Sequence, residues 1–155
     1  MSYLAKIDSK DIEDFLNSWK DQIVNIGKVF LEEGDYKKSC LTFIKNHYAF
    51  DECEVLFKPT FTKDVVFRNN INDALSYFVS GDIDEDSGFA IKPWKKISIS
   101  ETNIIHFEDS VAVMGIFILE PEKSPEITNV AFTFVLIKTD QGELKIRLHH
   151  SSVIT

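Results

Sequence analysis

Residues 8–34 read DSKDIEDFLNSWKDQIVNIGKVFLEEG, and their apolar residues recur every three or four positions. This spacing keeps one face of a helix apolar. The residues on that face are Ile12, Phe15, Leu16, Trp19, Ile23, Ile26, Phe30 and Leu31. Asp8 or Ser9 can cap the start of the helix, and Gly34 can end it in a left-handed conformation. A helix this long with a single apolar stripe must lie across a large hydrophobic surface.

Two shorter helices are predicted after the first. Residues 36–48 carry apolar side chains at every fourth position, as expected for one side of a helix. Residues 72–79 form the third helix, with Asn70 or Asn72 as its cap and Gly81 at its end. Brief extended segments are expected at residues 55–57 and 65–68.

The second half of the chain is typical of strands. Four alternating or β-rich segments lie at residues 97–100, 111–119, 130–137 and 144–150. Turns separate the last three from their neighbours at residues 108–109, 121–125 and 140–142, so we expect consecutive strands to pair antiparallel. Helices first and a sheet last predict an α+β fold with the helices on one face of the sheet. The length predicts one domain over residues 1–155.

The last predicted strand contains two adjacent histidines. Its apolar alternation places four residues on one side of the sheet: Leu144, Ile146, Leu148 and His150. We therefore expect His150 to point into the apolar interior and His149 to point outward. A histidine in that position could act as a general base with a pKa lowered by burial. The alternative is a core histidine that is hydrogen-bonded to a neighbouring strand.

The two middle strands are apolar on both faces. In residues 111–119 one side carries Val111, Val113 and Phe117, and the other carries Ala112, Met114, Ile116 and Ile118. Residues 130–137 behave similarly. A strand that is apolar on both faces is buried on both faces, and the helices can cover only one of them. We expect the other face to pack against a second copy of the chain, giving a homodimer through the sheet.

The composition limits the possible partners. Lysine and arginine total 17 against 25 aspartate and glutamate, a formal charge of −8, which disfavours nucleic acids and anionic membranes. Residues 1–10 lack the apolar run of a signal peptide, and no stretch reaches the roughly 20 apolar residues of a membrane span, so a cytoplasmic location is expected. Cys40 and Cys53 form no Cys-x-x-Cys pair, and neither a metal nor a cofactor is predicted. The 13 phenylalanines predict a thick aromatic core, an aromatic-lined cavity, or both.

Residues 140–152, DQGELKIRLHHSS, resemble the last strand of the calcium/calmodulin-dependent protein kinase II association domain and its bacterial relatives. These proteins belong to the nuclear-transport-factor-2-like, or SnoaL-like, superfamily. An uncharacterised bacterial branch of the superfamily is similar over residues 55–152, in phrases such as LFKPT (56–60), ALSYFV (74–79) and LHHSS (148–152). The resemblance implies a cone-shaped fold, in which helices and a curved antiparallel sheet enclose a pocket.

Several side chains are candidates for that pocket. Arg68 lies in a Phe-Arg phrase that resembles one in these relatives. It could grip a carboxylate or phosphate of a small ligand, or it could form an internal ion pair with Asp86 or Glu85. Tyr77 could donate to a ligand oxygen and Trp94 could stack on a flat ligand, because both lie beside glycine or proline breaks where pocket rims are often built. Packing alone is the alternative for both.

Three functions remain open at this point. The first is a domain that binds a small molecule with an anionic or polar group through Arg68, Tyr77, Trp94 and His150. The second is an acid/base enzyme of isomerase, dehydratase or polyketide-cyclase type, in which His150 or Asp86 moves a proton and Tyr77 or Arg68 steadies an enolate oxygen. The third is a non-catalytic oligomerisation hub. The superfamily hosts all of these on one scaffold.

Overall fold

The computed structural model describes residues 7–155. Residues 1–6, which belong to the segment where no signal peptide is predicted, lie outside this range. The helices are α1 (Ser9–Leu31), α2 (Tyr36–His47), α3 (Ile71–Val79) and a 3₁₀ helix, η1 (Phe89–Ile91). The strands are β1 (Leu56–Lys58), β2 (Trp94–His106), β3 (Ser110–Pro121), β4 (Thr128–Lys138) and β5 (Leu144–Val153). Within residues 7–155 no helix has the length and apolar content needed to cross a membrane.

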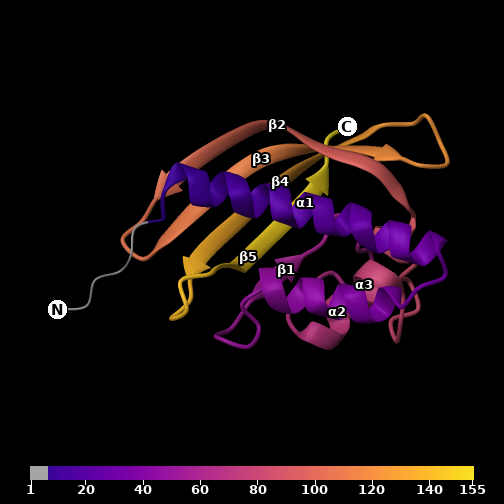
Figure 1. Cartoon of the computed structure of the whole chain (residues 1–155), viewed down its shortest axis with the longest axis horizontal. Coiled ribbons are helices and arrows are strands. Elements are labelled where there is room, and N and C mark those ends of the chain that lie inside the picture. Colours follow the sequence, from indigo (N-terminus) through magenta and orange to yellow (C-terminus); the bar gives the residue numbers. More distant parts are fainter. Residues whose placement is uncertain (1–6) are drawn as a thin grey trace.

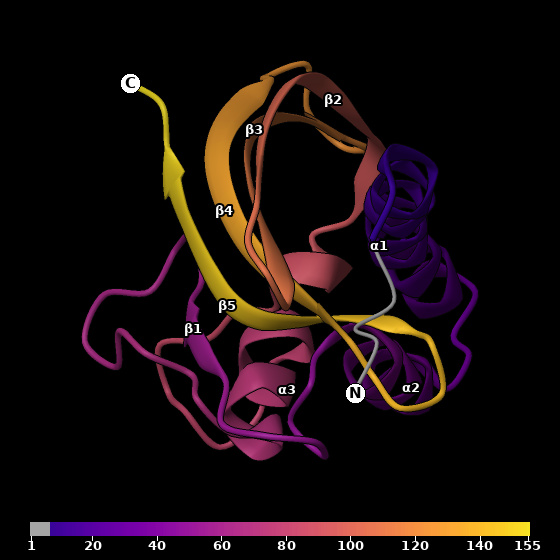
Figure 2. The same cartoon turned by 90° about the vertical axis from the view of Figure 1, so that its left-hand side faces the viewer.

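The strands form one bent sheet in the order β1-β5-β4-β3-β2 (Figure 1). Strands β2 to β5 pair antiparallel, as predicted, whereas β1 adds to β5 in parallel. Figure 2 shows the sheet curling toward α1, with α2 and α3 packed near its lower part. The predicted α+β architecture, with helices covering one face of a curved sheet, is confirmed, and the core lies between these layers.

Local sequence explains the two ends of α1. Asp8 caps the start: its carboxylate accepts from the backbone N–H of Asp11 at 2.8 Å, and the Asp11 carboxylate accepts from the Asp8 N–H. At the other end the left-handed residue is Glu33, with φ 59°, and not Gly34 as predicted. The Gly34 N–H donates to the Val29 carbonyl at 2.8 Å, and a Cβ on Gly34 would lie 2.9 Å from the Val29 side chain. Gly34 is therefore needed for this close approach and not for its dihedral freedom.

The third helix begins as predicted but ends differently. The Asn70 side chain accepts from the N–H of Asp73 at 2.9 Å and caps the start of α3. The helix ends at Ser80, which has φ 67°, and not at Gly81. A positive φ is uncommon for a residue with a side chain. Here the Ser80 hydroxyl donates to the carbonyl of Asp86 at 3.1 Å, which helps to hold the turn.

Residues 65–68 form a loop, and the prediction of a strand there is wrong. The backbone N–H of Val65 donates to the carboxylate of Glu85 at 2.8 Å, so it is not available to a neighbouring strand. The N–H of Arg68 donates to the carbonyl of Phe57 at 2.7 Å and ties the loop to β1. The valine-rich sequence favours an extended ladder, but contacts with the distant acidic loop determine the conformation.

The last strand places its two histidines the opposite way round from the prediction. Between Ile146 and Leu148 the pairing with β4 shifts by one residue, so Arg147 is the extra residue of a β-bulge. Because side chains alternate along a strand, one extra residue exchanges the two faces beyond it. His149 is therefore buried, only 4% exposed, and His150 is open to solvent.

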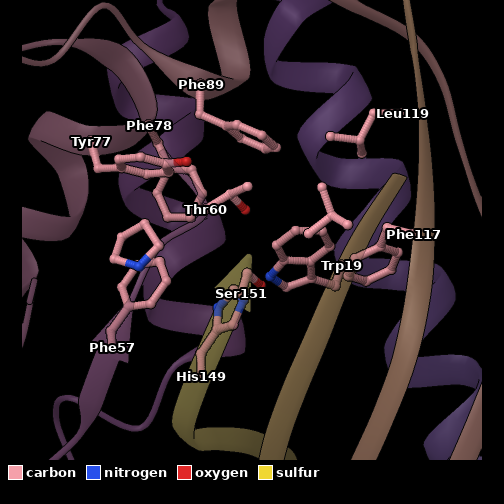
Figure 3. A pocket seen from close by; sticks show the side chains of 12 residues that line it. Trp19, Phe57, Thr60, Tyr77, Phe78, Phe89, Phe117, Leu119, His149 and Ser151 are labelled. Carbon is pink, nitrogen blue, oxygen red and sulfur yellow. Dashed lines mark hydrogen bonds between the residues drawn. The ribbon is translucent and has the colours of Figure 1, made fainter. Parts of the chain in front are cut away.

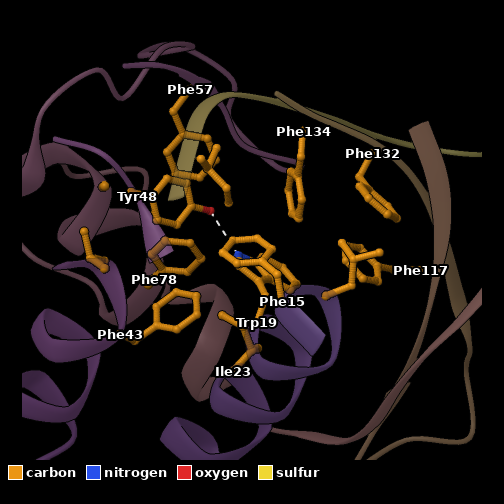
Figure 4. Close-up of a cluster of buried hydrophobic side chains, with 14 of the residues drawn as sticks. Phe15, Trp19, Ile23, Phe43, Tyr48, Phe57, Phe78, Phe117, Phe132 and Phe134 are labelled. Atoms are coloured by element: carbon orange, nitrogen blue, oxygen red, sulfur yellow. Dashed lines mark hydrogen bonds between the residues drawn. The ribbon is translucent and has the colours of Figure 1, made fainter. Parts of the chain in front are cut away.

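Aromatic rings fill most of the space between α1 and the sheet (Figure 4). Trp19 stacks on Phe117 with ring centroids 4.8 Å apart, and Phe117 stacks on Phe132 at 4.0 Å. Gly115 makes room for this stack, since a Cβ there would lie 2.8 Å from the ring of Phe132. The predicted aromatic core is confirmed, and it leaves little open space inside the fold.

The outer face of β3 and β4 is apolar, and no other part of residues 7–155 covers it. Met114 at its centre is 58% exposed. Half-buried apolar side chains surround it: Ile116, Ile118, Val135 and Ile137. The packing of a second copy against this face remains a prediction.

Candidate functional site

A largely enclosed cavity lies between α1, α3, the sheet and the segment that follows β1 (Figure 3). Its volume is about 10 Å³. That is roughly the space one water needs. The cavity is therefore narrow, with about the space of a single water.

Most of the cavity wall is apolar and aromatic. The side chains of this wall include Trp19, Phe57, Phe78, Phe89, Phe117 and Leu119. They come from α1, β1, α3, η1 and β3, so the wall forms only when all the layers are packed. Four polar side chains interrupt it: Thr60, Tyr77, His149 and Ser151. Figure 3 shows Tyr77 and Thr60 on one side of the space, with Ser151 and His149 on the other.

Tyr77 is a neutral hydrogen-bond donor at this site. The backbone N–H of Phe61 donates to Tyr77 Oη at 3.2 Å, which leaves the hydroxyl hydrogen of Tyr77 for another acceptor. Burial raises the pKa of Tyr77, and hydrogen bonds from Phe61 and from the side chain of Thr60 offset only part of this effect. Tyr77 therefore keeps its proton throughout the physiological range.

Strand β5 supplies the opposite side of the cavity. His149 Nε2 lies 2.6 Å from Ser151 Oγ, and His149 Nδ1 lies 2.9 Å from Tyr48 Oη. The imidazole stacks on the ring of Phe57 with centroids 4.6 Å apart. Burial lowers the pKa of His149 well below its ordinary value of 6.5, and nearby positive charges act in the same direction. The ring is therefore neutral at physiological pH.

Arg68 is buried in an ion pair and does not line the cavity. It donates to the two carboxylate oxygens of Asp86 at 2.6 and 2.8 Å and to Glu85 at 3.2 Å. Asp86 also accepts from the Ser76 hydroxyl at 2.6 Å. Of the two interpretations of Arg68, the internal ion pair is the one observed. The guanidinium lies over the ring of Tyr77, 5.8 Å from its centroid, and so makes a cation–π contact with this cavity residue.

The remaining predicted site residues, Asp86, Trp94 and His150, also lie outside the cavity lining. Asp86 is occupied by the ion pair, and its side chain is 3% exposed. Trp94 is buried at the start of β2 and donates to the carbonyl of Phe89 at 2.8 Å. His150 faces solvent because of the bulge. Of the predicted residues, the structure places Tyr77 alone in the cavity lining.

A second hollow opens between α1, α2 and the start of β5. It is wider than the cavity and more open, and its lining includes Ser18, Asn46 and His47. His47 Nδ1 lies 2.8 Å from the carbonyl of Phe43, and its Nε2 lies 2.8 Å from Ser18 Oγ. Both ring nitrogens are thus satisfied within the fold. The enclosed cavity is the more sheltered of the two and brings Thr60, Tyr77 and Ser151 together in an aromatic wall, and we therefore take it as the candidate site.

The candidate site has no fully charged group in its wall. The lining contains no aspartate, glutamate, lysine or arginine, and His149 and Tyr77 are both neutral for the reasons above. Over residues 7–155 no three side chains of the His, Cys, Asp and Glu types come together in a way that could hold a metal ion. The site thus offers a ligand an apolar surface and neutral hydrogen-bond donors.

Comparison with known proteins places the chain in a family. The family model described as MICAH, metal-independent carbonic anhydrase, matches residues 10–153. The chain belongs to this family of metal-independent carbonic anhydrases. A metal-independent carbonic anhydrase from a Nostoc species is 33% identical to it over 141 residues, which is 88% of this chain and 68% of that protein.

Solved structures agree with this membership in the metal-independent carbonic anhydrase family. The crystal structure of a cyanobacterial iota-carbonic anhydrase complexed with bicarbonate is 29% identical, with a TM-score of 0.92 over 100% of this chain and 97% of that chain. A nuclear-transport-factor-2-like protein of unknown function from Shewanella oneidensis is 15% identical, with a TM-score of 0.61 over 94% and 99% of the two chains. The predicted nuclear-transport-factor-2-like fold is therefore confirmed. The sequence resemblance indicated an uncharacterised branch, whereas the matching family is named for carbonic anhydrase activity.

Three polar residues of the site were not predicted as site residues. Thr60 and Ser151 lie in the phrases LFKPT and LHHSS, so a signal was present in the resemblance, although it gave them no role. His149 was assigned to the outside because the bulge at Arg147 has no marker in the sequence. A proline or glycine often marks an irregular strand, and here the extra residue is an ordinary arginine.

Proposed function

We propose that this protein interconverts carbon dioxide and bicarbonate in the enclosed cavity, and that Ser151, Tyr77 and Thr60 contact the reacting atoms. The cavity lining carries the proposal, because it combines a sheltered aromatic wall with hydroxyl groups on two sides. Family membership supports the assignment. So does the bicarbonate bound by the cyanobacterial relative.

Hydration needs a place for an apolar molecule and a way to stabilise an anion. Carbon dioxide has no net dipole, so the wall around Trp19 and Phe117 can hold it. A water oxygen then bonds to the carbon, one C=O electron pair moves onto oxygen, and the proton lost by the water passes to a solvent base. Negative charge develops on the carbon dioxide oxygens. Donors that are already in place where charge develops stabilise the transition state.

Ser151 and Tyr77 can provide those donors without a net charge, and Thr60 lies beside Tyr77 in the cavity lining. Ser151 lies on one side of the cavity, and Thr60 and Tyr77 lie on the other (Figure 3). A planar anion held between them can accept hydrogen bonds from both sides. Since every step is reversible, the same contacts serve the dehydration of bicarbonate.

Catalysis is expected to survive removal of metal ions. The purified full chain, dialysed against a strong chelator, should accelerate carbon dioxide hydration in a stopped-flow assay with a pH indicator. The reason is that the reaction proposed here uses hydroxyl donors, and residues 7–155 contain no metal-ligand cluster. Loss of activity on dialysis that is restored by a metal would contradict the proposal, as would a rate equal to that of buffer alone.

A matched preparation separates this activity from contamination by a host enzyme. The Ser151→Ala variant, purified in the same way, should lose most of the rate, whereas a contaminant would be present equally in both samples. Binding can be measured independently with ¹³C-labelled bicarbonate, whose NMR line should broaden in the presence of the wild-type protein. No broadening at any concentration would count against an anion site in this cavity.

We also propose that the outer face of the sheet joins two copies of the chain. The support is the exposed Met114 and the half-buried apolar residues around it on β3 and β4. An uncovered apolar face of this kind is typical of an interaction surface.

The Met114→Glu variant should therefore be monomeric. We expect light scattering of the wild type to give twice the chain mass of 17.8 kDa, and the variant to give 17.8 kDa, because a buried unpaired carboxylate opposes association. Leu31→Glu is the matched control, since Leu31 is 46% exposed at the end of α1 and away from this face. A wild-type mass of 17.8 kDa at micromolar concentration would exclude the dimer.

A further inference from the structure

A chain of buried hydrogen bonds leads from the core to the candidate site. Trp19 Nε1 lies 3.2 Å from Tyr48 Oη, as the dashed line in Figure 4 marks, and Tyr48 Oη lies 2.9 Å from His149 Nδ1. His149 Nε2 lies 2.6 Å from Ser151 Oγ. Tyr48 is 1% exposed and Ser151 is 3% exposed. The chain ends at Ser151, whose hydroxyl faces the cavity.

Counting hydrogens gives this chain a direction. The indole N–H of Trp19 can only donate, so Tyr48 Oη accepts there. Among the described residues, His149 Nδ1 is the other hydrogen-bond partner of that hydroxyl, so Tyr48 must donate its one hydrogen to Nδ1. The neutral imidazole then carries its hydrogen on Nε2 and donates it to Ser151 Oγ. Ser151 accepts from the protein and has its own hydrogen to donate into the cavity.

The reverse arrangement leaves a buried group unsatisfied. If Nδ1 carried the hydrogen, Tyr48 would accept from both Trp19 and His149, and its own hydrogen would have no acceptor in the apolar core. A buried donor without a partner is destabilising. The Ser151 hydrogen would also point back to Nε2 and away from the ligand. The first arrangement satisfies every group and is therefore the stable one.

Packing prevents a flip of the His149 ring that would exchange the positions of Nδ1 and Nε2. It stacks on Phe57 at 4.6 Å and meets the edge of Phe134 at 4.6 Å with an interplanar angle of 88°. Trp19 also lies edge-on to it at 5.9 Å. A ring packed on its faces and edge keeps one orientation. The positions of Nδ1 and Nε2 are thus fixed by packing, and the tautomer is fixed by Tyr48.

We propose that Trp19 and Tyr48 are positioning residues that set the Nε2–H tautomer of His149 and so make Ser151 a hydrogen-bond donor to the ligand. This inference rests on the proposed function for its catalytic meaning. It assigns His149 the role of orienting the serine and not that of a general base, because its Nε2 already carries a hydrogen and its Nδ1 accepts one. An anionic oxygen of bicarbonate is the acceptor that such a serine favours.

The tautomer can be measured directly in the wild-type protein. Protonated and unprotonated imidazole nitrogens have well-separated ¹⁵N chemical shifts, so a spectrum of ¹⁵N-histidine-labelled full chain at neutral pH identifies the nitrogen that carries the hydrogen. We expect Nε2–H for His149. An Nδ1–H signal for this residue would overturn the inference, and it would leave the proposed carbon dioxide chemistry untouched.

The Tyr48→Phe variant tests the link between the tautomer and the ligand. Without the Tyr48 hydroxyl, Nδ1 loses its donor, so we expect a mixture of tautomers and a kcat/KM for hydration that is about 10- to 100-fold lower. Tyr36→Phe is the matched control, because the Tyr36 ring packs on Phe30 away from the cavity, and it should change neither quantity. A Tyr48→Phe variant with wild-type kcat/KM and a mixed tautomer would refute the positioning role. If the wild type showed no hydration activity but His149 were Nε2–H, the proposed function alone would fall.

Discussion

The Ser151→Ala variant is expected to lose about 100-fold in kcat/KM for carbon dioxide hydration, because removal of one preplaced donor to a developing anion costs that much in comparable sites. Ser151 lines the cavity and its Oγ lies 2.6 Å from His149 Nε2, so a serine that accepts from His149 can donate its own hydrogen to the ligand. Stopped-flow hydration measures the loss. The fold should be retained, since the change removes one atom from a position next to a cavity.

Ser152→Ala provides the matched control for this prediction. Ser152 is the next residue of β5 and is exposed, because it lies on the other face of the strand. We expect its removal to leave the hydration rate within experimental error. Equal losses in the two variants would mean that the strand end and not the Ser151 hydroxyl affects the rate, and an unchanged Ser151→Ala enzyme would place the reaction elsewhere.

The Arg68→Met variant is expected to lose about 3–5 kcal/mol in free energy of unfolding. The guanidinium is completely buried, and its removal leaves the Asp86 carboxylate, 3% exposed, without its cation. The same change breaks the hydrogen bonds from Arg68 to the carbonyls of Val65 and Asp73. Urea unfolding followed by the fluorescence of the buried tryptophans measures the effect as a shift in midpoint at an unchanged slope.

Two further variants identify the cause of that loss. Adding Asp86→Asn to Arg68→Met should recover part of the stability, because a neutral amide is less costly to bury than an unpaired carboxylate. Lys10→Met removes one partner of an exposed ion pair, with side chains 78% and 61% exposed, and should have no measurable effect. A loss below about 1 kcal/mol for Arg68→Met would show that the pair is screened like a surface pair.

The fold could be predicted from the sequence because its signals are local and repeated. The apolar stripe from Ile12 to Ile26 specifies the buried face of α1, and the β-rich runs after Trp94 specify the sheet, whereas Leu31 at the end of the predicted stripe is exposed. The segments where prediction failed depend on distant contacts. Residues 65–68 read as a strand, but Glu85 binds their loop through backbone N–H groups.

The site was predicted less well, for two physical reasons. An extra residue at Arg147 exchanges the faces of β5, so the adjacent histidines take each other's predicted places. A buried arginine requires a counter-charge, but the sequence alone does not say whether protein or ligand provides it. Here Asp86 provides it. Tyr77 lies in the cavity lining, close to the break after α3 that suggested a pocket rim, and its contact with a ligand stays a prediction.

Because the guanidinium of Arg68 is neutralised inside the fold, an anion in the cavity meets hydroxyl groups and aromatic rings but no counter-ion. An ion pair with the product would hold bicarbonate much more firmly than carbon dioxide, and slow departure of the product would then limit turnover. Neutral donors bind bicarbonate less tightly than a cation would, so its affinity is closer to that of carbon dioxide. Under the proposed function, the ion pair of Arg68 with Asp86 and Glu85 therefore favours release of bicarbonate, because it keeps the guanidinium from binding the anion.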